Sequence, residues 1–150
     1  MRCEPRCTVG RCPLQGWVKF GGNSCIKIYP SLKKTWAEAE AICRVIGRGS
    51  HLVRISSNDE SLAIKREFDL LKSAWVDTLW IGLNDIEQEL NRTWVGHQYE
   101  ENMFKSIDIE FLYFTDPGFN CGVLGLSNPV AWSFQLCSDK VGFVCQQPLA

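Results

Sequence analysis

The sequence has no excess of charge of either sign and no long apolar run. Its 16 basic and 17 acidic side chains give a formal net charge of -1 at pH 7. With so little net charge and no basic stripe interleaved with aromatic residues, the chain lacks the positive surface that nucleic-acid binding requires. No apolar run approaches the roughly 18 residues that a membrane-spanning helix needs. We therefore expect neither a nucleic-acid partner nor a transmembrane segment in this chain.

Motifs of catalysis are also missing. His51 and His97 are the two histidines of the chain, and neither stands in a catalytic motif. The sequence has no His-Glu-x-x-His zinc motif, no Gly-x-Ser-x-Gly elbow and no phosphate-binding Gly-rich loop. Its carboxylates are scattered, and nothing brings two of them together as an acid–base pair. We predict that the protein is not an enzyme.

Eight cysteines are present, and no two of them form a Cys-x-x-Cys pair. The lack of that pair argues against a zinc ribbon and a thioredoxin-like redox site. The even count predicts four disulfides in a secreted protein or a receptor ectodomain, because disulfides persist in oxidising compartments. Met1 is followed directly by Arg2 and Cys3, without a signal-peptide pattern. We therefore expect the chain to be a processed or excised segment.

The 150 residues fit one domain that mixes helices and strands. Residues 17–20 and 24–29 flank Gly21-Gly22-Asn23, a pattern typical of a β-hairpin with a three-residue turn. Further strands are expected at 51–55, at 80–85, around Trp94, and at 121–124, 131–133 and 142–145.

Two capping boxes predict two helices. Thr35-x-x-Glu38 starts the first, and Ser57-x-x-Glu60 starts the second. Apolar residues recur at helical spacing on one face of each helix. The residues of these two inner faces are Trp36, Ala39, Cys43 and Ile46 in the first helix and Ile64, Phe68 and Leu71 in the second. Gly47 and Gly49 are expected to end the first helix.

Four separate motifs follow one another along the chain. The first helix begins with Thr35-Trp36-Ala37-Glu38-Ala39, the strand Trp80-Ile81-Gly82-Leu83 comes next, and Asn120-Cys121-Gly122-Val123-Leu124 and Phe143-Val144-Cys145 follow near the end. This order resembles the long form of the C-type lectin-like domain. The resemblance implies an α+β fold in which two helices flank small antiparallel sheets, with a long loop region on one side. It covers residues 12–146, preceded by an irregular Cys-containing lead-in at 1–11 and followed by a tail at 147–150.

The resemblance also implies the disulfide pairing. The pairs would be Cys12–Cys25, Cys43–Cys145 and Cys121–Cys137. Cys3 and Cys7 are left over, and either could bridge to another chain instead of pairing with the other. The protein would then be a monomer or a disulfide-linked dimer.

Sugar-binding members of the family hold calcium with two triplets that this sequence lacks. The first is Glu-Pro-Asn or Gln-Pro-Asp in the long loop, where this chain reads Asp116-Pro117-Gly118. The second is Trp-Asn-Asp on the following strand, where this chain reads Trp132-Ser133-Phe134. We therefore expect no cofactor and no calcium at the usual site. The alternative is a displaced metal site built from the acidic residues of the loop: Glu100, Glu101, Asn102, Asp108, Glu110 and Asp116.

The long loop is the expected binding surface. Aromatic residues surrounded by charge are favoured at protein interfaces. The candidate contact residues are Phe111, Tyr113, Phe114, Asp116, Phe119 and Phe134. We expect an extracellular module that binds a protein ligand or cell-surface receptor, or mediates adhesion, without calcium. The alternative is a lectin that binds carbohydrate through a displaced cation or by stacking on aromatic rings. Asn91-Arg92-Thr93 is a glycosylation sequon, which agrees with a secreted location.

Overall fold

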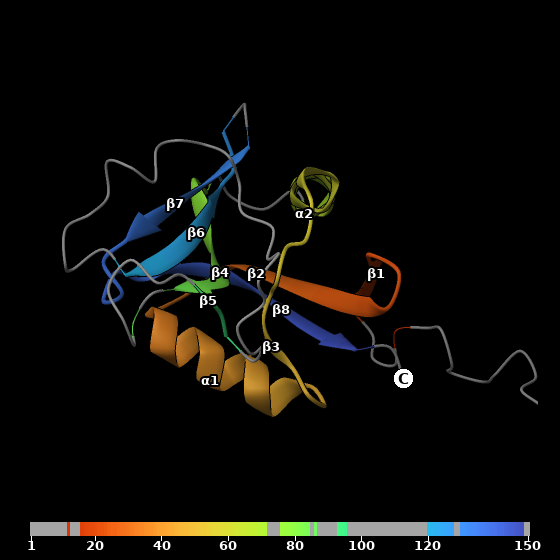
Figure 1. Cartoon of the computed structure of the whole chain (residues 1–150), viewed down its shortest axis with the longest axis horizontal. Helices are drawn as coiled ribbons and strands as arrows, with labels where there is room; N and C mark the ends of the chain where they lie inside the picture. Colours follow the sequence, from red (N-terminus) through yellow and green to blue (C-terminus); the bar gives the residue numbers. More distant parts are fainter. Residues whose placement is uncertain are drawn as a thin grey trace, which may run out of the picture.

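The computed structural model describes residues 12, 16–71, 76–84, 86, 93–95, 120–127 and 130–148. The elements, drawn in Figure 1, are β1 (Val18–Phe20), β2 (Ser24–Lys34), α1 (Trp36–Ile46), β3 (His51–Leu52), α2 (Asn58–Leu70), β4 (Thr78–Asn84), β5 (Thr93–Trp94), β6 (Cys121–Gly125), β7 (Ala131–Gln135) and β8 (Val141–Pro148). In the described part of the chain, neither helix is long and apolar enough to cross a membrane.

The strands form one connected sheet in the order β1-β2-β8-β4-β6-β7, with β3 paired to β8 and β5 paired to β4. The predicted α+β fold with two helices is confirmed. In place of several small antiparallel sheets, however, β8 joins the strands into one sheet, and its pairing with β4 is parallel. The reason is the length of β8, which pairs with β2 along most of its course and still contacts Leu79 and Trp80 of β4.

The predicted hairpin is confirmed. Phe20 faces Ser24 across the turn, and Gly21 takes a positive φ of 62°, which glycine adopts without strain. The Ser24 hydroxyl donates to the carbonyl of Phe20 at 3.0 Å and closes the turn. Cys25, the second residue of β2, is bonded to Cys12 as the resemblance implied.

Helix α1 begins with the predicted capping box. The Glu38 N–H donates to Thr35 Oγ1 at 3.2 Å, and the Thr35 N–H donates to Glu38 Oε1 at 3.1 Å. This second bond, from the Thr35 backbone, lowers the pKa of the Glu38 carboxyl below its ordinary value of 4.5. The inner face of α1 is buried at Trp36, Ala39 and Cys43. Cys43 is bonded to Cys145 of β8, so the helix is covalently fixed to the middle of the sheet.

Helix α2 departs from the prediction at both ends. Ser57 accepts a bond from the Glu60 N–H at 3.2 Å, but the Glu60 carboxylate turns to the N–H of Ser56 at 2.7 Å, so the reciprocal half of the box is shifted by one residue. At the other end the helix stops at Leu70. Leu71 therefore leaves the buried stripe and is 49% exposed, whereas Ile64 is fully buried and Phe68 packs at the edge of the core.

Strand β3 is shorter than predicted because a side chain replaces the backbone ladder. The Val53 N–H still donates to the carbonyl of Val144, but the Arg54 N–H donates to the side-chain Oε1 of Gln146 at 2.8 Å. The strand pairing therefore ends at Leu52, although Val53 and Ile55 remain buried. Strand β8 runs to Pro148, two residues past the end predicted for the domain.

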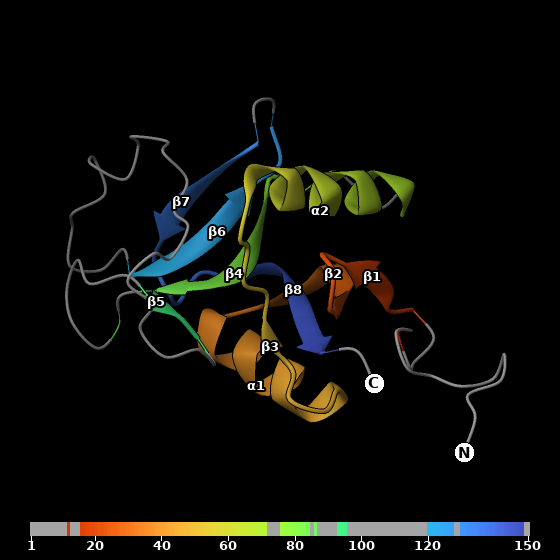
Figure 2. The same ribbon diagram turned by 45° about the vertical axis from the view of Figure 1, so that its right-hand side comes forward.

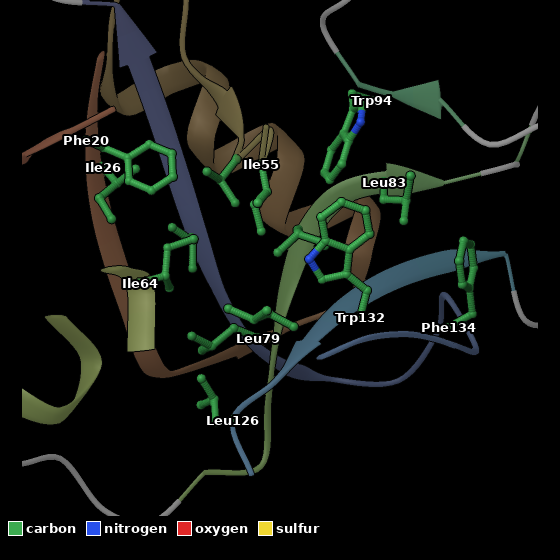
Figure 3. Close-up of a cluster of buried hydrophobic side chains, with 14 residues drawn as sticks. Phe20, Ile26, Ile55, Ile64, Leu79, Leu83, Trp94, Leu126, Trp132 and Phe134 are labelled. Carbon is green, nitrogen blue, oxygen red and sulfur yellow. The ribbon is translucent and has the colours of Figure 1, made fainter. Parts of the chain in front are cut away.

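The core is divided between the two faces of the sheet, as the alternation of β4 requires. Leu79, Ile81 and Leu83 point into the cluster that α2 covers. Figure 3 shows this cluster, which includes Trp94 and Trp132. Trp80 points the other way, into the cluster that holds Cys43, Cys145 and the inner face of α1. Strand β4 therefore contributes side chains to both halves of the core.

Gly82, between these side chains, is where the backbone of β4 comes closest to the segment after β3. A Cβ at this position would lie 2.9 Å from the carbonyl oxygen of Leu52 and 3.1 Å from that of Val53. The glycine N–H donates to Val53 O, and its carbonyl accepts from the N–H of Val95. Only a residue without a side chain allows this approach.

Candidate functional site

Most of the predicted site falls outside the described residues. This holds for the aromatic and acidic loop residues Phe111, Tyr113, Phe114, Asp116 and Phe119, and for the alternative metal ligands Glu100, Glu101, Asn102, Asp108, Glu110 and Asp116. Asn91, Cys3 and Cys7 also lie outside them. These assignments remain predictions. The described residues define the strands from which residues 96–119 extend.

Both flanks of that segment are attached to the end of β4. On one side Asn84 pairs with Thr93 and Leu83 pairs with Trp94, and the Val95 N–H donates to Gly82 O at 2.9 Å. On the other side Asn84 is the partner of Cys121, the first residue of β6. The described chain on both sides of residues 96–119 is therefore paired with one residue, Asn84.

Asn84 itself is occupied by local hydrogen bonds. Its Nδ2 donates to Gly82 O at 3.1 Å, and its Oδ1 accepts from the N–H of Ile86 at 3.2 Å. The residue is 7% exposed, and each end of its amide already has a partner. It ends the strand in a side-chain turn of the kind that asparagine favours.

Strand β7 directs its large side chains into the core. Trp132 donates its indole N–H to Ser61 Oγ at 3.2 Å and packs edge-on against Trp94, with ring centroids 5.1 Å apart. Phe134, two residues on, lies on the same face and is 2% exposed. A buried ring offers no surface to a partner, so the structure does not support Phe134 as a contact residue.

The described residues of this strand do not fit a calcium ion. Calcium takes 6–8 oxygen ligands. Between Trp132 and Phe134, Ser133 supplies one hydroxyl, and Phe134 has no oxygen in its side chain. Within the described ranges, no group of three or more His, Cys, Asp or Glu residues is placed to hold a metal ion. The strand that carries the cation ligands in sugar-binding relatives therefore does not carry them here.

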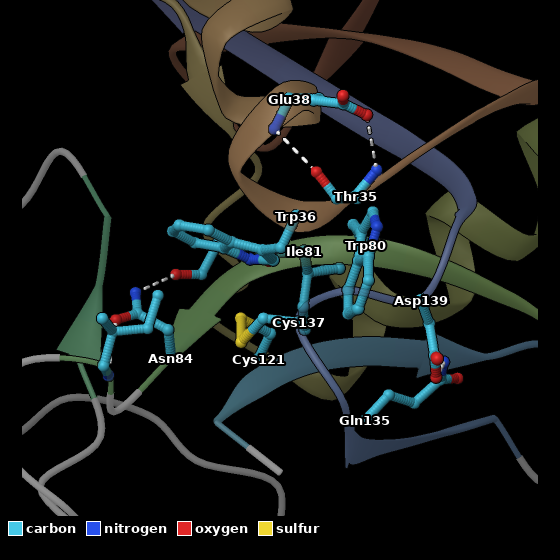
Figure 4. Close-up of a disulfide and its surroundings, with 12 residues drawn as sticks. Thr35, Trp36, Glu38, Trp80, Ile81, Asn84, Cys121, Gln135, Cys137 and Asp139 are labelled. Atoms are coloured by element: carbon cyan, nitrogen blue, oxygen red, sulfur yellow. Dashed lines mark hydrogen bonds between the residues drawn. A yellow bond between two sulfur atoms is a disulfide. The ribbon is translucent and has the colours of Figure 1, made fainter. Parts of the chain in front are cut away.

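A disulfide joins β6 to the chain after β7. Cys121 at the start of β6 is bonded to Cys137, just after β7, as implied by the resemblance (Figure 4). The Cys137 carbonyl accepts from the Trp36 N–H at 3.1 Å, which joins this corner to the start of α1. Gln135 Nε2 donates to Asp139 Oδ2 at 3.1 Å and holds the turn that follows. The start of β6 is therefore linked covalently to the chain after β7 and, through Cys137, by a hydrogen bond to the start of α1.

A polar cavity that no sequence motif indicates lies at the other end of the sheet. It is about 450 Å³ in volume and is lined by Asn23, His51, Arg54, Glu60 and Gln146, among others. These residues come from the hairpin turn, β3, the segment before α2, α2 and β8. Because they are far apart in sequence and share no motif, the sequence does not predict that they meet, and the capping box assigns Glu60 to the start of a helix.

Comparison with known proteins agrees with this fold. The family profile described as "Lectin C-type domain" matches residues 32–147. The C-type lectin mannose-binding isoform of Notechis scutatus scutatus is 31% identical over 147 residues, covering 90% of this chain and 82% of that protein. Snaclec 3 of Daboia siamensis is 29% identical over 136 residues, covering 90% and 80%. The crystal structure of human lithostathine superposes with a TM-score of 0.81 at 22% identity, covering 99% of this chain and 98% of its own. The chain belongs to the C-type lectin domain family.

Proposed function

We propose that the protein is an extracellular binding module, not an enzyme, and that it recognises a protein partner without calcium. The observation that carries this proposal is the sequence and orientation of β7. Trp132 and Phe134 face the core, and Ser133 provides a single hydroxyl where a cation needs several oxygens. Asn84, at the end of β4, already makes two hydrogen bonds within its own turn.

The proposed contact surface is the segment 96–119, whose two described flanks are paired with β4. Its aromatic residues Phe111, Tyr113, Phe114 and Phe119 stand beside acidic ones, a composition that protein interfaces favour. Binding surfaces are commonly built on loops held by a rigid scaffold. The attachment of both flanks to β4 supports this assignment.

An extracellular location is supported by three disulfides in the described part of the chain. Bonds of this kind persist in secreted proteins and ectodomains. Asn91 would then carry a glycan, and Cys3 or Cys7 could link two chains.

The alternative function is carbohydrate binding. One relative bears the words mannose-binding in its name. In this chain such binding would require a displaced cation held by the acidic residues of the loop, or stacking of a sugar on its aromatic rings. The two functions differ in their dependence on calcium and on the chemistry of the ligand.

The first test is a pair of thermal melts of the oxidised protein, in excess calcium and in EDTA. A cation at a hundredfold excess over its dissociation constant adds about 2.7 kcal/mol to the free energy of unfolding. For a chain of this size that gain raises the Tm by about 5–11 °C. For the native protein, we expect the melt in calcium to superimpose on the melt in EDTA. The same is expected for Ser133→Ala. A Tm raised by calcium contradicts the proposal, and loss of that rise in Asp116→Asn would assign the ion to the acidic loop.

The second test asks what kind of molecule is recognised. Fluorescent tetramers of the domain are incubated in EDTA with a panel of cells that are untreated, protease-treated or periodate-oxidised. We expect staining that protease removes and that periodate leaves intact. Staining that is lost after periodate and survives protease would support the carbohydrate alternative. Phe111→Ser and Tyr113→Ser should weaken staining. The control is Lys19→Ser, because the Lys19 side chain is exposed on β1.

A further inference from the structure

A second cavity lies where β2 ends and where β4 and β8 begin. It is about 310 Å³ in volume, and it shares no lining residue with the polar cavity beside the hairpin. Figure 2 shows β5 beside the opposite end of β4, where Asn84 pairs with the flanks of residues 96–119. The seven residues of β4 separate its two ends by about 20 Å. The second cavity is therefore distinct from both places described above.

Two lysines line this cavity, and the backbone next to them is fixed. Lys34, the last residue of β2, pairs with Val141, the first residue of β8. The Lys34 carbonyl also accepts from the indole N–H of Trp80 at 2.7 Å. Lys33 and Lys140 directly precede the two paired residues, and both line the cavity. Strand pairing therefore brings to one place two ammonium groups that are far apart in the sequence.

The hydrogen-bond donors of the lining have no acceptors of their own. Neither Lys33 nor Lys140 makes an ion pair or a side-chain hydrogen bond with any described residue. Thr78, the first residue of β4, is half-buried in the lining, and its hydroxyl has no partner in the described chain either. Two ammonium groups and a hydroxyl therefore border the same cavity without an acceptor.

The charge of the lining is positive. It holds the two ammonium groups against one carboxylate, that of Asp77, which is exposed and forms no ion pair with either lysine. Two further acidic side chains on adjoining segments have other hydrogen-bond partners. Glu38 accepts from the Thr35 N–H, and Asp139 accepts from the side chain of Gln135. An anion that enters the cavity therefore meets positive charge that no described residue has paired.

A phosphate group matches both the charge and the donors of this lining. At neutral pH a phosphate monoester carries a charge of about −1.5 to −2 and presents three strong acceptor oxygens. Lysine binds phosphate as a point charge, and a threonine hydroxyl can donate to a further oxygen. A carboxylate offers a single charge and only two oxygens. We propose that this cavity binds a phosphate group, either as the free ion or at the end of a monoester.

The proposed site is independent of the protein-binding function assigned to residues 96–119, because it lies at the other end of β4. Both lysine side chains are exposed, so salt screens their attraction for an anion. Their stems must also be ordered when the ligand binds. We therefore expect dissociation constants of about 1–10 mM at low ionic strength, and several-fold weaker binding at about 0.15 M salt.

The test is an NMR titration of the oxidised, ¹⁵N-labelled protein at about pH 8, where phosphate carries two charges. The probes are sodium phosphate and methyl phosphate at up to about 50 mM, with sodium chloride of equal ionic strength as the reference. Acetate and methyl sulfate serve as singly charged probes. We expect saturable shifts of the backbone signals of Thr78, Lys140 and Val141 with phosphate. Saturation by methyl phosphate as well would extend the site to monoesters, and saturation by inorganic phosphate alone would restrict it to the free ion.

Matched variants connect the shifts to the cavity. Lys33→Gln and Lys140→Gln should each weaken phosphate binding about three- to tenfold, because each removes a charge-assisted hydrogen bond. Lys19→Gln is the control, since Lys19 is exposed on β1 and does not line the cavity. Asp77→Asn should tighten binding about two- to fivefold, because it removes a charge of the same sign as the ligand from the lining.

Four results would overturn the proposal. The first is the absence of a saturable shift with both phosphate and methyl phosphate. The second is binding of acetate or methyl sulfate as tight as that of phosphate. The third is weaker binding of phosphate to Asp77→Asn, which would show that the carboxylate attracts the ligand. The fourth is a loss of binding in Lys19→Gln equal to that in Lys33→Gln and Lys140→Gln.

Discussion

Replacement of Gly82 by alanine tests the central packing of this fold. The added methyl group would lie 2.9 Å from the carbonyl oxygen of Leu52, 3.1 Å from that of Val53 and 3.0 Å from a methyl group of Val95. Two of these three neighbours are backbone atoms. Val53 O cannot move away freely, because it accepts the hydrogen bond of the Gly82 N–H itself at 2.9 Å.

Overpacking of this kind destabilises a core by about 1–3 kcal/mol. For a domain of about 150 residues this corresponds to a fall in Tm of about 2–12 °C. The assay is a thermal melt followed by circular dichroism, with all disulfides oxidised and their number checked by mass spectrometry. Amide hydrogen exchange should also be faster at Val95, whose N–H donates to Gly82 O.

Gly22→Ala is the matched control, since a Cβ at that position would meet nothing within 4 Å. We expect it to melt with the native protein or up to about 1 kcal/mol more stable, because alanine restricts the unfolded chain. If Gly82→Ala melts with Gly22→Ala, then the approach of β4 to the segment after β3 does not require glycine and the packing argument is wrong.

Three further predictions follow from the covalent links, the capping box and the core. Cys43→Ser removes the bond to Cys145, which spans 102 residues, and should lower the free energy of unfolding by about 4–5 kcal/mol. A loss of unfolding free energy in urea melts of less than half this value would contradict the prediction. The carboxyl of Glu38 has a folded pKa below its unfolded value of 4.5, so it stabilises the native state above pH 4.5 and loses this effect as the pH falls through the lower folded value. The difference in Tm between the native protein and Glu38→Gln should therefore shrink from pH 7 towards pH 3. A difference that grows on acidification would contradict the predicted direction of this pH dependence. Trp132→Phe should be more destabilising than Trp94→Phe by about 1 kcal/mol, because the Trp132 N–H donates a buried bond whereas that of Trp94 has no partner in the described chain; equal losses in urea melts would contradict this.

The parts of the fold that could be predicted from sequence are those with local signals. Thr35 and Glu38 are three residues apart and recognise each other within one helical turn, and Gly21-Gly22-Asn23 specifies its turn without help from the rest of the chain. The three described disulfides came from the resemblance, since cysteine spacing alone does not determine their partners.

The parts that could not be predicted depend on contacts between distant segments. β3 is shortened by the side chain of Gln146, which is 92 residues away from Arg54 in the sequence. The cavity needs Asn23, His51 and Glu60 side by side, and no pattern within any one of their segments indicates that meeting. Phe134 could have been placed correctly, because the alternation of the predicted strand puts it on the same face as Trp132.

The central position of β8 has a consequence for how a cell makes this protein. β8 pairs with β2, β3 and β4, yet it is synthesised after all the other described strands. At about 5–20 residues per second, Cys145 leaves the ribosome roughly 5–20 s after Cys43. During that interval the thiol of Cys43 meets other cysteines before its own partner exists. Correct pairing must therefore depend on exchange after synthesis, and yields of recombinant protein should rise when a disulfide isomerase is supplied.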